Sequence, residues 1–175
     1  MPPVDQPISL TRYLIEEQRA GHVSADLRLL IERELASPRV EPGAITLEGP
    51  PLRLAATAVQ PMVMVLHELA SNAFRHGSLS RPGGQLRVSW QPRRREGEGG
   101  TLRLRWEETG GPGLVPPAQS GFGSRVIAAT VRGQLGGTLA FDWTADGMVC
   151  DITIPLARWL TDAGALHLEV GAAPP

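Results

Sequence analysis

Three polar residues recur at helical spacing between residues 66 and 77. Glu68 and Asn72 are four positions apart and Arg75 is three further on, so a helix would carry all three side chains on one face. A carboxylate can hold a metal-bound water, an amide oxygen can ligate a hard cation, and a guanidinium pairs with phosphate oxygens. This row suits a magnesium–phosphate site, but taken alone it is more typical of the solvent-facing stripe of an amphipathic helix.

A second candidate lies at residues 106–113, Trp-Glu-Glu-Thr-Gly-Gly-Pro-Gly, where a predicted strand ends. At a ligand cleft, a carboxylate in this place can accept a hydrogen bond from an exocyclic amine such as that of adenine. Glycines beside it let the backbone approach the ring. Taken alone, an ordinary strand end followed by a loop explains the segment better.

A third candidate is the turn at residues 121–125, Gly-Phe-Gly-Ser-Arg, at the start of a predicted helix. Two glycines at a helix N-terminus expose backbone N–H groups to an anion, and the helix dipole adds to the attraction. The turn lacks the third glycine of a dinucleotide-binding fingerprint, and no Lys-Ser/Thr pair follows as in a P-loop. Both of these commoner nucleotide-binding folds are therefore disfavoured.

The elements that would position these residues mix helices and strands. Hydrophobic periodicity and Gly/Pro punctuation predict helices at residues 10–19, 25–36, 57–76 and 122–134, and strands at residues 45–48, 52–54, 85–91, 101–108, 138–143 and 148–155. The helices would gather on one face of a mostly antiparallel sheet. The predicted fold class is α+β, a two-layer α/β sandwich.

Local signals predict where the two central helices begin and end. Ser24 is a good N-cap for the helix at 25–36. Thr57 and Gln60 form a capping-box pattern that would open the longest helix, and Gly77 would stop it. Residues 93–95, all arginine, lie among glycines and acidic residues, so we expect them at an exposed hairpin tip.

Length and composition indicate one soluble domain. The chain has 175 residues, 42% of them hydrophobic, and a formal net charge of −1, which gives no pull toward nucleic acid or an anionic membrane. Cys150 is the only cysteine, so no intrachain disulfide can form. No apolar stretch approaches the ~20 residues needed to cross a bilayer, and residues 1–5 lack the layout of a signal peptide. We expect a cytoplasmic domain without membrane contact.

In this order, the three candidates resemble the Bergerat ATP-binding fold of histidine kinases and gyrase-type ATPases, and in detail the HWE histidine kinases. That family is named for a histidine in an asparagine-containing helix motif and for a Trp-x-Glu in the first glycine box. Here the helix motif is His-Glu-Leu-Ala-Ser-Asn-Ala at residues 67–73, and the Trp-x-Glu lies at residues 106–108. The resemblance covers most of the chain, from about Ala25 to Leu156. Also similar to the family are the glycine turn at residues 121–124, Leu-Gly-Gly-Thr at 135–138, and Ile-Thr-Ile-Pro at 152–155.

The resemblance implies the catalytic domain of a two-component sensor kinase, with ATP and Mg²⁺ as cofactors. Asn72 would be the metal ligand, Glu68 would position a metal-bound water or act on the phosphoryl path, and Arg75 would bind phosphate. Glu108 would accept the adenine amine. No role follows for His67, for which helix packing is as good an explanation as catalysis. The other residues implied in the nucleotide pocket are His76, Gly110, Gly111, Gly121, Phe122, Gly123, Ser124 and Arg125.

A complete kinase of this kind needs a phosphoacceptor histidine on a helical hairpin. None of the four histidines, His22, His67, His76 and His167, lies in that setting. The γ-phosphoryl would therefore pass to a histidine on a separate domain of the parent protein, with a response regulator downstream. We divide the chain into residues 1–24, which could be the end of that hairpin, a catalytic domain at 25–157, and a C-terminal tail at 158–175. The isolated domain is expected to be monomeric.

Two other functions fit parts of the pattern. A free-standing serine kinase of the anti-sigma type has the same fold and needs no acceptor histidine, but the Trp-x-Glu and Gly-Gly-Pro boxes argue against it. A degenerate domain could scaffold a phosphotransfer partner without binding ATP. The presence of Glu68, Asn72 and Glu108 argues against this second alternative.

Overall fold

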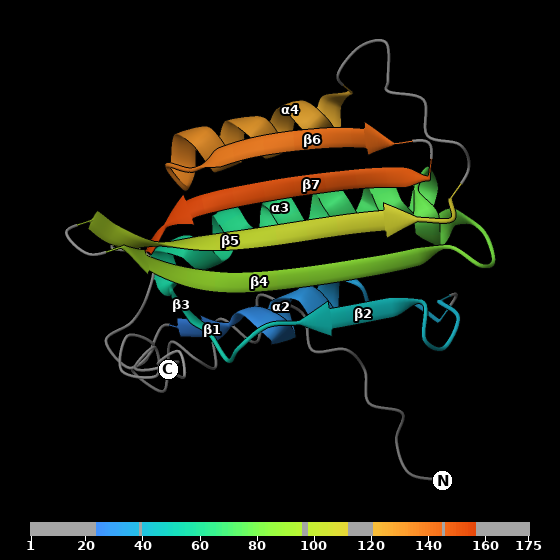
Figure 1. The fold of residues 1–175 in the computed structure, drawn as a ribbon, viewed down its shortest axis with the longest axis horizontal. Helices are drawn as coiled ribbons and strands as arrows, with labels where there is room; N and C mark the ends of the chain where they lie inside the picture. The colour runs from blue at the N-terminus through green and yellow to red at the C-terminus, as the bar shows by residue number, and fades with distance from the viewer. Residues whose placement is uncertain (1–23, 39, 96–97, 112–120, 145, 157–175) are drawn as a thin grey trace, which may run out of the picture.

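A computed structural model describes residues 24–38, 40–95, 98–111, 121–144 and 146–156, and these form two layers (Figure 1). One layer is a five-stranded sheet with the strand order β2-β4-β5-β7-β6. β2 runs parallel to β4, and the other neighbouring pairs are antiparallel. The expected mostly antiparallel sheet is therefore confirmed. Its strands are β2 (Ile45–Glu48), β4 (Gln85–Arg95), β5 (Glu98–Thr109), β6 (Thr138–Thr144) and β7 (Gly147–Pro155).

Helices form the other layer. Figure 1 shows α2 (Leu27–Glu34), α3 (Ala56–Arg75) and α4 (Phe122–Ala129) on the same side of the sheet, with α3 behind the central strands. This arrangement confirms the two-layer α+β fold. The short elements are the two-stranded pair β1 (Ser24–Asp26) and β3 (Arg53–Ala55), the 3-10 turn η1 (Ser78–Ser80) after α3, and the π-helix η2 (Thr130–Gln134) after α4.

The sheet is apolar on the face toward the helices and charged on the other. The register places Trp106 of β5 between Val88 of β4 and Cys150 of β7, and all three are buried. Arg103 and Arg105 alternate with the buried residues of β5, so they lie on the opposite face. A side-chain nitrogen of each lies about 3 Å from a carboxylate oxygen of Asp151. The helices of the described residues therefore cover the apolar face of the sheet (Figure 1). Full burial of one large side chain there stabilises the fold by about 1.5–3 kcal/mol.

Two helix starts differ from the prediction. Ser24 lies in β1, and pairing with β3 keeps residues 24–26 extended. The N-cap of α2 is instead Asp26, whose Oδ1 accepts a hydrogen bond from the Leu29 amide at 3.2 Å. α3 begins at Ala56 without a side-chain cap, so the predicted capping box of Thr57 and Gln60 is wrong.

The strand and terminal predictions have mixed outcomes. β4 continues to Arg95, so the three arginines at 93–95 belong to a paired strand and not to the hairpin tip. The predicted helix at residues 10–19 and the tail at residues 158–175 lie outside the described residues.

Within the described part of the chain, no helix is long and apolar enough to span a membrane.

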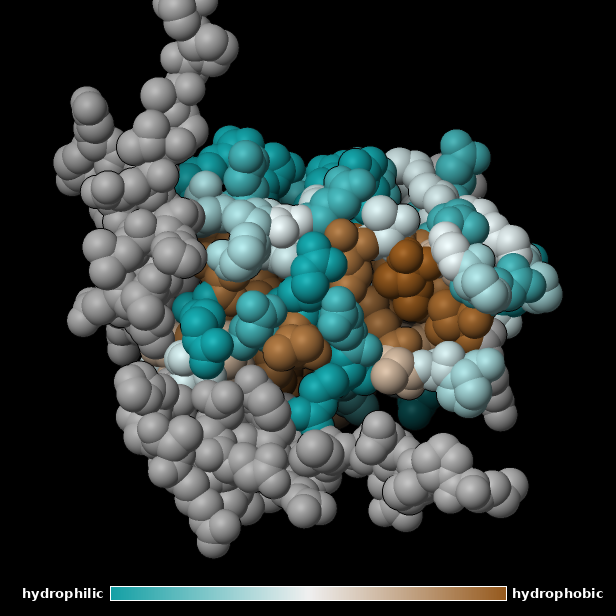
Figure 2. All heavy atoms as spheres, turned by 90° about the horizontal axis from the view of Figure 1, so that it is seen from below, coloured by the Kyte–Doolittle hydropathy of each residue, from teal (hydrophilic) through white to brown (hydrophobic). Residues whose placement is uncertain are grey.

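The side of the molecule below the sheet edge at β2 is mixed in character. Figure 2, viewed from below relative to Figure 1, shows apolar side chains between polar ones on this side. Leu29 of α2 is one of three large hydrophobic residues exposed within the described chain, at 47%.

Candidate functional site

The polar row of the first motif lies on α3, and the helix predicted to carry it is confirmed. Leu66, Leu69, Ala70 and Ala73 are buried on the opposite side of the helix. This packing leaves Glu68, Asn72 and Arg75 on the side that the sheet does not cover. Glu68 and Asn72 are half-buried, whereas Arg75 is exposed.

The glycine turn of the third motif packs directly against this row. A Cβ atom added at Gly123 would lie 2.8 Å from Glu68 Oε2, and 3.5 and 3.6 Å from the side-chain nitrogen and oxygen of Asn72. A side chain at this position would have to displace the end of the Glu68 side chain, so glycine lets the start of α4 come close to α3. Gly121 is the N-cap of α4 and supplies no side chain to its first N–H groups. The fold thus brings an uncapped helix N-terminus, a carboxylate and an amide together.

Glu68 and Asn72 suit Mg²⁺ only as part of a ligand set. Within the described residues there is no group of three or more His, Cys, Asp or Glu side chains that could hold a metal ion. Mg²⁺ keeps several waters and is commonly held by one or two protein oxygens together with the phosphates of a substrate. The amide oxygen of Asn72 and the carboxylate of Glu68 fit that second mode.

Two other predicted site residues, Arg75 and His76, lie at the C-terminal end of α3. Arg75 lines a groove between α2 and α3 that also includes Glu34 and His67. His76 is exposed and forms the C-cap of α3. Of the residues predicted for the metal and phosphates, the structure brings Glu68, Asn72 and Gly123 together.

Glu108 lies at the end of β5 and is almost completely buried, at 2% exposure. Its Oε1 accepts a hydrogen bond from the Trp106 indole at 2.9 Å, and its Oε2 accepts one from the Ser78 amide at 2.8 Å. Burial raises the pKa of the Glu108 carboxyl above its ordinary value, and the hydrogen bonds from the Ser78 amide and the Trp106 indole, together with the nearby Ser78 hydroxyl, partly oppose that rise. Each carboxylate oxygen still has a second lone pair for a ligand.

Trp106 and Glu108 meet because alternate residues of a strand point to the same face. The sequence analysis named Glu108 as a candidate and Trp106 only as part of the Trp-x-Glu motif. The structure shows that Trp106 is fully buried in the core and also donates its only polar hydrogen to Glu108. The Trp-x-Glu spacing thus has a direct structural reason.

Glycines hold the loop after β5 against the turn after α3. A Cβ at Gly77 would overlap Glu108 Oε2, and one at Gly111 would lie 3.0 Å from Ser78 Cα. Gly110 has φ +69°, a conformation that L side chains rarely adopt. Ser78, which the sequence analysis missed, is at the centre of these contacts. Its hydroxyl is buried and has no hydrogen-bond partner among the described residues.

His67 points to a different partner. Its Nδ1 lies 2.9 Å from Glu34 Oε2 at the end of α2, and the two residues are 33 positions apart in the chain. The His67 side chain is 66% exposed and that of Glu34 18%. The structure therefore supports helix packing as the explanation for this residue: it connects α2 to α3.

Replacing His67 with alanine is expected to lower the free energy of unfolding by less than about 1 kcal/mol, because exposed charge pairs contribute little. Nucleotide affinity should stay within twofold of wild type. Chemical unfolding and calorimetric titration with ADP would measure both quantities. A loss of affinity above tenfold at unchanged stability would instead place His67 in the nucleotide site.

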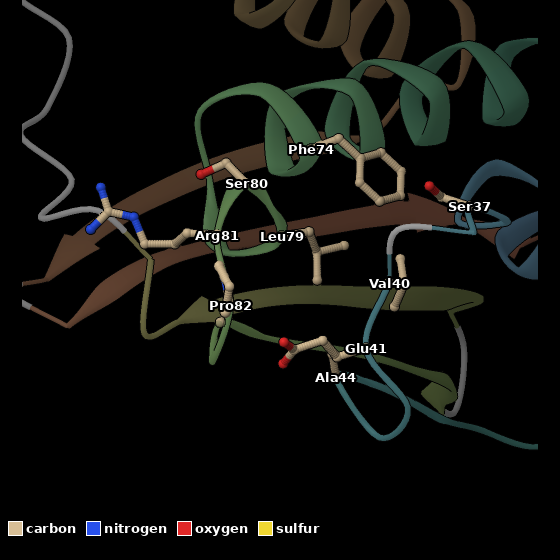
Figure 3. Close-up of a pocket in the computed structure, with 10 residues that line it drawn as sticks. Ser37, Val40, Glu41, Ala44, Phe74, Leu79, Ser80, Arg81 and Pro82 are labelled. Atoms are coloured by element: carbon tan, nitrogen blue, oxygen red, sulfur yellow. The ribbon is translucent and has the colours of Figure 1, made fainter.

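A separate cavity of about 340 Å³ lies on the other side of the turn after α3 (Figure 3). The close-up shows Phe74 of α3 and Leu79 of η1 facing Val40 from the segment before β2. None of the predicted site residues lines this cavity. We therefore assign it no part in the candidate site.

The sequence is similar to proteins named as histidine kinases. No protein-family model matches the sequence. A blue-light-activated histidine kinase of Rhizobium johnstonii is 41% identical over 127 residues, which are 71% of this chain and 36% of that protein. A protein of the same name from Brucella anthropi is 33% identical over 112 residues, 64% of this chain and 23% of that protein. The chain spans about a third or less of the length of these relatives.

Solved structures show the same fold. The histidine kinase domain of the Erythrobacter litoralis EL346 blue-light-activated histidine kinase matches with a TM-score of 0.55 at 22% identity, covering 75% of this chain and 59% of that chain. The mycobacterial sensor histidine kinase MprB matches with a TM-score of 0.56 at 18% identity, covering 77% of this chain and 97% of that chain. At these identities the likeness concerns the fold alone.

Proposed function

We propose that the chain is a histidine kinase catalytic domain that binds ATP with Mg²⁺ and transfers the γ-phosphoryl to a histidine on a separate helical-hairpin domain. Its similarity to a histidine kinase at 41% identity and the shared fold support this proposal. The observation that carries this proposal is the packing of Gly123 against Glu68 and Asn72. It places backbone N–H donors of α4 beside two oxygen-bearing side chains. A phosphate chain with a bound hard cation needs both kinds of group.

Asn72 would ligate the metal through its amide oxygen, and Glu68 would hold a water of the metal's shell or act on the phosphoryl path. Mg²⁺, when bound, would neutralise charge on the phosphates. Because phosphoryl transfer needs mainly positioning and charge stabilisation, these residues would act by fixing the phosphate chain. Arg75 is exposed at the end of α3, and its guanidinium would pair with a phosphate oxygen.

Glu108 would recognise the base by accepting the exocyclic amine of adenine. Its buried carboxylate is held from both sides by N–H donors, so its orientation is fixed before a ligand arrives. The remaining contacts would come from the backbone at Gly110, Gly111 and Gly121, and from His76, Phe122, Ser124 and Arg125. Phe122 is 75% exposed, so its ring is free to contact a ligand.

The partners follow from the same proposal. The parent protein would supply the phosphoacceptor hairpin, and a response regulator would receive the phosphoryl group from it. Assignment to the HWE subgroup rests on His67, Trp106 and Glu108. Each of the three has a contact that gives it a structural role. His67 lies within hydrogen-bond distance of Glu34, and Glu108 accepts hydrogen bonds from Trp106 and from the Ser78 amide.

The isolated chain is expected to bind ADP in the presence of Mg²⁺, because the base and phosphate sites both lie within one domain. Calorimetric titration with ADP, with and without Mg²⁺, is the direct measurement, and a thermal shift by nucleotide is the second. ADP is preferred to ATP because it cannot be turned over. No heat and no thermal shift at millimolar nucleotide would favour the degenerate scaffold over the kinase.

A further inference from the structure

Ser78 is a buried serine whose hydroxyl makes no well-formed hydrogen bond to the described residues, although it lies near enough to Glu108 to lower the pKa of that carboxyl. It is the first residue of η1 and has 0% exposure. Its Oγ is the single buried side-chain nitrogen or oxygen among the described residues that lacks a hydrogen-bond partner. Native proteins rarely bury such a group unless a ligand or an ordered water satisfies it.

The surroundings hold this hydroxyl beside Glu108. The Ser78 amide donates to Glu108 Oε2 at 2.8 Å. On one side, a Cβ at Gly111 would lie 3.0 Å from Ser78 Cα, and on another, a Cβ at Gly84 would overlap the Ser78 carbonyl. The backbone of Ser78 is therefore fixed by close contacts. The hydroxyl can rotate about one bond, but it cannot leave the vicinity of the carboxylate.

We propose that the Ser78 hydroxyl donates a hydrogen bond to one of the two adenine ring nitrogens that flank the exocyclic amine, N1 or N7, while Glu108 accepts from the amine. This inference rests on the proposed ATP-binding function and makes Ser78 a second residue that recognises the base. The chemistry is complementary, because the carboxylate offers only acceptors and the hydroxyl supplies the donor that a ring nitrogen needs. The orphan hydroxyl and the tethered carboxylate then form one recognition unit.

The test is Ser78→Ala with three nucleotides: ADP, 1-deaza-ADP and 7-deaza-ADP. ADP affinity is expected to fall about threefold to tenfold, the equivalent of one neutral hydrogen bond. For the analogue that lacks the partner nitrogen, wild type and variant should bind equally, since neither can form the bond. The stability of the nucleotide-free variant should be unchanged or slightly higher, because alanine removes an unpaired hydroxyl.

Ser80→Ala is the matched control on the same turn. Its Oγ donates to the Gly77 carbonyl at 2.7 Å, so this variant should lose stability while its relative affinities for the three nucleotides match wild type. If Ser78→Ala binds ADP as tightly as wild type, or loses the same factor with all three nucleotides, the inference is wrong while the proposed function stands. Failure of wild type to bind ADP would overturn both.

Discussion

Replacing Asn72 with alanine is expected to reduce phosphoryl transfer to a supplied helical-hairpin domain by about a hundredfold or more. Alanine removes the amide oxygen, and Mg²⁺ tolerates little distortion of its octahedral shell. Gly123 packs against this side chain, so the start of α4 would also lose a contact that positions it over the phosphates. Transfer should be followed with γ-labelled ATP under single-turnover conditions. Without the hairpin domain, wild type should not become labelled.

The nucleotide affinity of this variant separates a metal role from a general loss of structure. Asn72→Ala should lose the part of ADP binding that depends on Mg²⁺ and keep the part that does not. Asn72→Asp, which retains an oxygen ligand, should restore part of the transfer rate. Ser71→Ala is the control, because Ser71 is adjacent in the helix but lines the groove with His67. Full transfer by Asn72→Ala would show that the row on α3 is only a solvated helix surface.

The parts of this site that could be predicted are those that depend on local sequence patterns. Glu68 and Asn72 share a helix, and a spacing of four residues is enough to place them on one face. Gly121 and Gly123 mark a helix start by composition alone. That the turn at Gly123 packs against Asn72, 51 positions earlier by residue number, depends on how α4 packs on α3. Resemblance to a family, and not periodicity, led to that expectation.

The parts that could not be predicted depend on tertiary contacts between distant or competing residues. Ser24 is a residue type that often caps helices. In the structure, however, pairing with β3 keeps it extended, and Asp26 caps α2 instead. His67 and Glu34 lie on different helices, so no local pattern connects them. Ser78 looks like an ordinary residue after a helix stop. Only its burial and its unpaired hydroxyl distinguish it.

Glu108→Gln should show the largest effect on nucleotide affinity, a fall of about tenfold to a hundredfold in ADP binding. A hydrogen bond to a charged group is worth about 1.5–3 kcal/mol, which corresponds to those factors. Both oxygens of Glu108 already receive N–H donors, so the NH₂ of glutamine must oppose one of them and the side chain will reorient. Discrimination between ATP and GTP should weaken as well, because an amide can donate to the carbonyl of guanine where a carboxylate can only accept.

The pH dependence of binding tests the same carboxylate without a change of shape. Burial raises the pKa of the Glu108 carboxyl. Above that pKa the carboxylate is ionised and accepts from the adenine amine, whereas below it a proton occupies one oxygen. The ADP affinity of wild type should therefore fall on acidification, beginning at a higher pH than it would for an exposed glutamate, and the affinity of Glu108→Gln should not show this dependence. Glu107→Gln is the control, since Glu107 is the neighbouring residue and lies within 3.9 Å of Arg105 on the charged face of the sheet. If Glu108→Gln keeps full affinity and base preference while Glu107→Gln loses them, the amine is recognised from Glu107 and the buried carboxylate serves the fold alone.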